Sequence, residues 1–139
     1  MYIPKHFKAH ELVPKEIYEK WGIRSFMFMD DRLLKLCDAL REEFGPATIN
    51  NYMWKGNRVA SGLRTPDSPH YSPTSQHSFG RAVDILFRNI SAEDVRECIK
   101  KDPKAWCVNG IESITLEDGV SWCHIDIRNG KAGVNSFKP

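Results

Sequence analysis

Apolar side chains recur with helical spacing in two segments of the chain. Between Asp30 and Phe44 the apolar positions follow a period near 3.6, and the segment starts with two aspartates, which favour a helix N-terminus. Gly45-Pro46 is typical of a helix end. A second helix is predicted from Ser91, whose hydroxyl suits an N-cap, to about Lys101, and Pro103 closes it.

Shorter apolar runs predict strands. Residues 47–52 are rich in strand formers, and residues 82–87 have the composition of a buried strand. Residues 114–117 and 120–128 indicate a hairpin, because Asp118-Gly119 between them is a favoured two-residue turn. Helices, strands and a hairpin in this order predict an α+β fold, a mostly antiparallel sheet with flanking helices.

Composition narrows the class of protein. With 139 residues, 41% of them hydrophobic, the chain is expected to form a single domain over residues 1–139. The formal net charge of +2 is too small to favour nucleic acid as the main partner. No apolar run approaches the roughly 18 residues of a membrane span, and the N-terminus lacks the hydrophobic core of a signal peptide. We therefore expect no membrane partner and no export signal.

Four cysteines are present, and none is spaced as a CxxC pair. In a chain without a secretion signal they are expected to be reduced thiols, mostly buried, and not a disulfide framework. They are Cys37, Cys98, Cys107 and Cys123.

A polar face is predicted for the second strand of the hairpin. A period of two places His124 and Asp126 on one face together with Trp122 and Arg128, and leaves Cys123 and its alternate neighbours for the core. This face is the candidate functional one. Upstream, the loop over residues 67–73 is rich in proline and small polar residues and is expected to pack over the site.

His77, Asp84 and His124 are candidate metal ligands. Imidazole nitrogen and carboxylate oxygen both bind zinc, and three protein ligands with a fourth position left for water form a catalytic layout. Gly80 allows the chain to bend between the first two ligands. Asp126 is a candidate acceptor for the second N–H group of His124.

These segments resemble the zinc D-Ala-D-Ala carboxypeptidase family, which has the hedgehog/DD-peptidase fold. The family motif SxHxxGxAxD is matched at Ser75, His77, Gly80, Ala82 and Asp84, and its later histidine at His124 in the run WCHID. The resemblance extends over nearly the whole chain and is greatest to small phage-encoded members. It implies that His77, Asp84 and His124 bind Zn²⁺. It also implies that Arg64, which follows a Ser-Gly pair, binds substrate and stabilises an oxyanion.

The chain departs from the family at the residue that handles the proton. Many relatives have a carboxylate three residues before the second histidine, where this chain has Ser121. Glu117 or Asp118 is the favoured replacement, although a regular hairpin would place Glu117 roughly 13 Å from His124. The alternatives are a hairpin tip that curls over the metal, a base supplied by Asp126 or another histidine, and a site that binds zinc without fast hydrolysis.

The function expected from the resemblance is zinc-dependent hydrolysis of amide bonds in peptidoglycan stem peptides or cross-links. The protein would then be an endolysin or virion-associated lysin of a phage, present in the cytoplasm of the producing cell or in the virion, and acting on the cell wall. Which bond is cut is left open. The alternative is a zinc-stabilised wall-binding or virion structural module without turnover, which the serine at position 121 favours.

Overall fold

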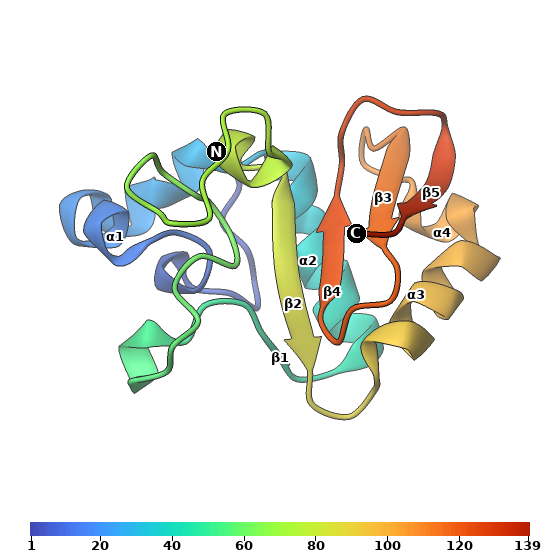
Figure 1. Cartoon of the computed structure of the whole chain (residues 1–139), viewed down its shortest axis with the longest axis horizontal. Coiled ribbons are helices and arrows are strands. Elements are labelled where there is room, and N and C mark those ends of the chain that lie inside the picture. The colour runs from blue at the N-terminus through green and yellow to red at the C-terminus, as the bar shows by residue number, and fades with distance from the viewer.

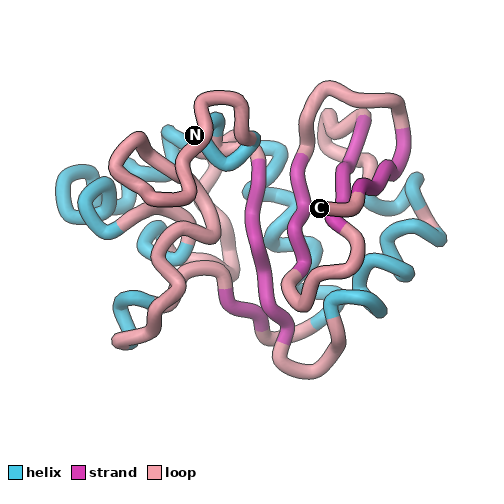
Figure 2. Tube along the Cα trace, in the orientation of Figure 1, coloured by secondary structure: helices cyan, strands magenta, loops and turns pink.

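A computed structural model describes all residues 1–139 and shows helices packed around one five-stranded sheet (Figures 1 and 2). The helices are η1 (Ala9–Glu11), α1 (Lys15–Trp21), η2 (Gly22–Phe28), α2 (Asp31–Phe44), η3 (Tyr52–Trp54), η4 (Gln76–Phe79), α3 (Ala92–Lys101) and α4 (Pro103–Trp106), where η marks a 3-10 helix. The strands are β1 (Ala47–Thr48), β2 (Ala82–Phe87), β3 (Ser113–Glu117), β4 (Cys123–Asp126) and β5 (Gly133–Phe137).

The sheet is mixed, with the strand order β1-β2-β4-β3-β5. Three of its pairings are antiparallel, and only β3 and β5 run parallel. Figure 1 shows α2 crossing behind β2 and β4, and buried leucines of α2 share one apolar core with residues of both strands. The expected α+β class with a mostly antiparallel sheet is confirmed. No helix is long and apolar enough to cross a membrane.

Three of the predicted elements are confirmed. Asp30 caps α2 by accepting a hydrogen bond from the backbone N–H of Arg32, and Ser91 caps α3 in the same way through Asp94. Strand β2 spans the predicted residues 82–87. Pro103 does end the second helix, but it also begins α4, where its missing N–H costs nothing.

The strand predicted over residues 47–52 is only partly present. Regular pairing covers Ala47–Thr48, and the chain then turns toward the N-terminal segment. Asn50 explains the change: its backbone N–H donates to Glu11, and its side chain donates to Val13 and accepts from the backbone N–H of Ser61. A buried residue with three hydrogen-bond partners outside the sheet, one through its backbone and two through its side chain, takes the place of a continued strand.

The predicted hairpin is present as the antiparallel pair β3 and β4, but its two-residue turn is wrong. β3 pairs with β4 through Leu116 opposite Ile125, so residues 118–122 form a five-residue loop and β4 starts at Cys123. Asp118 and Gly119 still lie in a turn, but the backbone N–H of Asp118 donates to Phe137 of β5 at 2.8 Å, so the pairing with β5 continues into the loop. When this register is continued by one residue, Glu117 lies opposite His124.

Candidate metal site

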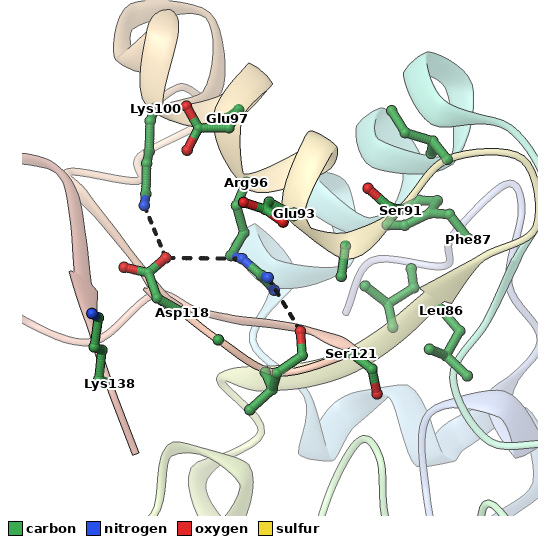
Figure 3. Close-up of a pocket in the computed structure, with 15 residues that line it drawn as sticks. Leu86, Phe87, Ser91, Glu93, Arg96, Glu97, Lys100, Asp118, Ser121 and Lys138 are labelled. Carbon is green, nitrogen blue, oxygen red and sulfur yellow. Dashed lines mark hydrogen bonds and ion pairs between the residues drawn. The ribbon is translucent and has the colours of Figure 1, made fainter.

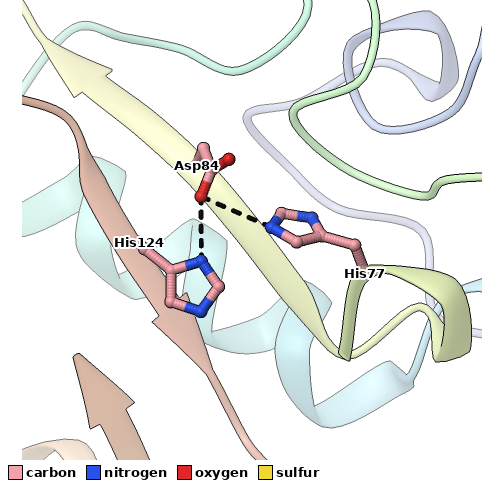
Figure 4. A group of neighbouring side chains, drawn as sticks. All are labelled: His77, Asp84 and His124. Carbon is pink, nitrogen blue, oxygen red and sulfur yellow. Dashed lines mark hydrogen bonds and ion pairs between the residues drawn. The ribbon is translucent and has the colours of Figure 1, made fainter. Parts of the chain in front are cut away.

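Two neighbouring strands and a short helix bring the three candidate ligands together (Figure 4). Asp84 of β2 lies directly across the sheet from His124 of β4, and η4 contributes His77. The Oδ1 atom of Asp84 lies 2.9 Å from Nδ1 of His124 and 3.4 Å from Nε2 of His77. One ligand atom from each residue lies within 4.8 Å of the other two. This group could hold a metal ion.

The position of His77 depends on the local structure of its motif. Ser75 caps η4 and accepts a hydrogen bond from the backbone N–H of His77. Gly80 ends the helix with φ +67°, and a Cβ atom there would lie 2.2 Å from the carbonyl oxygen of Phe28. Only glycine fits both the backbone angle and the close approach. The glycine of the motif therefore fixes the turn that leads from His77 into β2.

Hydrogen bonds outside the cluster orient both imidazole rings. Nδ1 of His77 donates to the carbonyl oxygen of Gly62 at 2.8 Å, and Nε2 of His124 donates to Asp126 at 2.8 Å. The other nitrogen of each ring faces Asp84 and is the atom that would bind a metal. The donor set is thus already arranged as a metal would require it.

Asp126 has the outer position predicted for it. Its side chain is fully buried and accepts from both His124 and the guanidinium of Arg128, whose Nε lies 2.8 Å from Oδ1. Burial alone would raise the pKa of Asp126, but Arg128 and His124 hold it below its usual value. The carboxylate stays ionised and keeps the ring of His124 in place.

The charges within the cluster favour a cation among these residues. Burial would raise the pKa of Asp84, but hydrogen bonds from His124 and His77 hold it well below its ordinary value. Burial would likewise lower the pKa of His124, but Asp126 and Asp84 raise it to about 9. In the metal-free protein, a proton on His124 supplies the positive charge between the two carboxylates.

The ligands open into a cavity of about 320 Å³ with a mostly polar lining. Besides the three ligands, the cavity is lined by Arg64, Thr74, Ser75, Gln76, Glu117, Trp122, Arg128 and Phe137. Thr74 to Gln76, and not the loop over residues 67–73 that we expected to cover the site, supply this part of the wall. Glu117 is half-buried here, on the same face of the sheet as His124, and the distance deduced from a regular hairpin does not apply.

The structure separates the two residues proposed to handle the proton. Asp118 does not line this cavity and instead forms an ion pair with Lys100 at 2.8 Å on the other side of the loop. Ser121 lies on that side too, in a separate groove. Of the acidic candidates at the β3 end, only Glu117 faces the cluster.

Arg64 lies at the edge of the cluster and contacts one of its members. Its Nη2 donates to Oδ2 of Asp84 at 3.0 Å, and its Nε donates to the carbonyl oxygen of Ala60 at 2.8 Å. The backbone N–H of Arg64 donates to the carbonyl of His77. Arg64 therefore fixes the second oxygen of Asp84 as well as facing the cavity.

One wall of the cavity has no signal in the sequence. Phe137 of β5 stacks edge-on against His124 with ring centroids 5.9 Å apart, and the guanidinium of Arg128 lies over the Phe137 ring, 5.4 Å from its centroid. β5 was not predicted because its residues are all partly or fully exposed and show no alternation of buried and exposed positions.

All four cysteines are free; Cys37 and Cys123 are buried, whereas Cys98 is exposed.

Comparisons with protein-family models, with curated proteins and with solved structures found no match for this chain. The assignment of a function therefore depends on the motif and on the geometry of the site.

Metal affinity is expected to rise with pH. The protonated His124 has no lone pair on Nδ1, and its pKa of about 9 means that metal must displace this proton at neutral pH. Between pH 6 and 8 the association constant should increase about tenfold per pH unit, the limit for the release of one proton. Competition with a chelating dye at three pH values measures it; an affinity that changes less than threefold over this range would contradict the charge arrangement.

Proposed function

We propose that this protein is a zinc-dependent peptidase that hydrolyses amide bonds of peptidoglycan stem peptides or cross-links. The observation that carries the proposal is the presence, in one cavity, of a two-histidine, one-carboxylate cluster with both rings oriented, next to a free carboxylate and a guanidinium. The match to the SxHxxGxAxD motif supports the substrate class.

Zinc suits the donor set better than magnesium or calcium, which prefer oxygen ligands. His77 would bind it through Nε2, His124 through Nδ1 and Asp84 through a carboxylate oxygen, because these are the atoms that face one another. Bound there, zinc polarises a carbonyl oxygen and lowers the pKa of water.

Glu117 is the residue we assign to proton transfer. It takes a proton from the water that attacks the carbonyl carbon, and passes it to the nitrogen of the amide as the C–N bond breaks, which leaves a carboxylate and an amine. Arg64 binds the developing oxyanion or a carboxylate of the substrate through the part of its guanidinium that Asp84 and Ala60 do not use. Asp126 takes no proton, because it stays paired with His124 and Arg128.

The second candidate is a zinc-stabilised module that binds the cell wall, or a structural part of a virion, without turnover. Ser121 favours it, since the position of the family carboxylate holds no acid and faces away from the cluster. Glu117 favours the enzyme, because its carboxylate lines the cavity and hydrolysis needs a group there that accepts a proton from water.

Digestion of purified peptidoglycan separates the two candidates. The zinc-loaded protein is expected to release peptides whose masses show the addition of one water per cleaved amide bond. A chelator should stop their release, and added zinc should restore it. Protein that holds one zinc per chain and binds the wall without releasing any product would overturn the peptidase and support the binding module.

A further inference from the structure

The loop between β3 and β4, residues 118–122, forms a wall between two cavities. On one side Trp122 and the adjoining Glu117 line the cavity of the metal cluster. On the other side Asp118 and Ser121 line a groove of about 750 Å³ beside α3 (Figure 3). Among the backbone hydrogen bonds of turns and loops, a single one involves this loop, from the N–H of Asp118 to β5. Between Asp118 and the paired Cys123, no backbone hydrogen bond therefore holds residues 119–122.

One buried side chain of α3 holds the rest of the loop. Nη1 of Arg96 donates to the carbonyl oxygen of Trp122 at 3.2 Å, and Nη2 donates to that of Val120 at 3.1 Å. Its Nε lies 3.8 Å from Oδ1 of Asp118 (Figure 3). Arg96 is only 5% exposed, and all three nitrogens of its guanidinium are directed at this loop. A planar fork can bridge two carbonyls at fixed separation, which an ammonium group cannot do.

A second cation of α3 strengthens the same anchor. Lys100, one helical turn after Arg96, donates to Oδ1 of Asp118 at 2.8 Å. The Lys100 ammonium group holds the pKa of Asp118 below its usual value, against the effect of burial. The loop is thus pinned at its start by two cations, and at its middle and end by Arg96.

We propose that Arg96 is a positioning residue of the site: by fixing the loop, it keeps Glu117 at one end and Trp122 at the other directed into the metal cavity. Arg96 does not line that cavity and touches none of the three ligands. The inference rests on the proposed peptidase function. It assigns a role in the chemistry to α3, a helix that contains none of the motif residues.

Arg96→Met tests this with the zinc-loaded full chain. We expect kcat for peptidoglycan peptide hydrolysis to fall about 10- to 100-fold, because small misplacements of a reacting group have effects of this size. KM and zinc affinity should stay within about threefold of wild type, since Arg96 contacts neither substrate nor ligands. Arg96→Lys, which keeps the charge but not the fork, should recover only part of the rate. Lys101→Met, on an exposed position of the same helix, is the matched control and should behave as wild type.

Backbone order parameters of residues 119–122, measured by NMR, give a readout that needs no turnover. In Arg96→Met they should drop from values typical of rigid backbone, about 0.85, to below about 0.6. If Arg96→Met folds poorly, Lys100→Met loosens the same anchor more gently and should lower kcat in the same direction. A rigid loop in Arg96→Met overturns the inference, and so does a loosened loop with kcat within twofold of wild type. A wild-type protein without hydrolysis would overturn the peptidase proposal, while the order parameters still decide whether Arg96 anchors the loop.

Discussion

Glu117→Gln is expected to lower kcat about 10²- to 10⁴-fold, the range for loss of a positioned general base. The amide keeps the size of the side chain but cannot accept the proton of the attacking water. Zinc affinity should change little, because Glu117 is not one of the three residues whose ligand atoms converge. Steady-state kinetics on a purified stem peptide, with the metal content measured for each sample, tests this.

Glu112→Gln is the matched control, because Glu112 precedes β3, is exposed and lies outside the metal cavity. Its kinetics should equal those of the wild type. If Glu117→Gln keeps kcat within threefold of wild type while Glu112→Gln does the same, Glu117 is not the base. Proton transfer would then have to be assigned to another group, and the binding module would gain support.

Asp126→Ala should weaken zinc binding about 10- to 100-fold, the usual effect of removing a partner that orients a metal-bound histidine. It should also lower the free energy of unfolding of the metal-free protein by about 1–3 kcal/mol, because Nε2 of His124 then loses its only acceptor inside the protein. The greater loss of stability that follows when one partner of a buried ion pair is removed does not apply here. The Arg128 side chain is 41% exposed, so its charge can turn to water.

Denaturant unfolding and dye competition measure the two effects. Glu43→Ala is the control for loss of a carboxylate, because Glu43 is exposed on α2 and forms no ion pair. It should leave both quantities within error of wild type. An Asp126→Ala protein with wild-type zinc affinity would show that His124 is held in place by other contacts.

Local patterns predicted the elements that carry their own signals. α2 and α3 have capping side chains and a continuous apolar face, and β2 has a buried run between two turns, so each could be recognised from its own residues. The convergence of His77, Asp84 and His124 was anticipated from the motif, and the structure places their ligand atoms together.

The β3–β4 connection could not be predicted in this way, because distant residues determine it. Asp118-Gly119 is a good turn sequence, but the hydrogen bonds that Arg96 donates to the loop, and the pairing of Asp118 with β5, favour a five-residue loop. Neither interaction is visible in the local sequence. The error mattered for the site, because the true register brings Glu117 to the metal cavity and sends Asp118 to the opposite side of the loop.

The pairing of Asp84 with His124 across β2 and β4 also constrains how the protein could acquire a metal. The two residues are 40 positions apart, so the loop that joins them must close before both can face one ion. During synthesis the chain has no complete site until β4 has left the ribosome and paired with β2. The SxHxxGxAxD segment by itself supplies only two of the three donors. Capture of a metal by this cluster would therefore be a late event in folding, and a bound ion would join the adjacent strands β2 and β4 and oppose their separation.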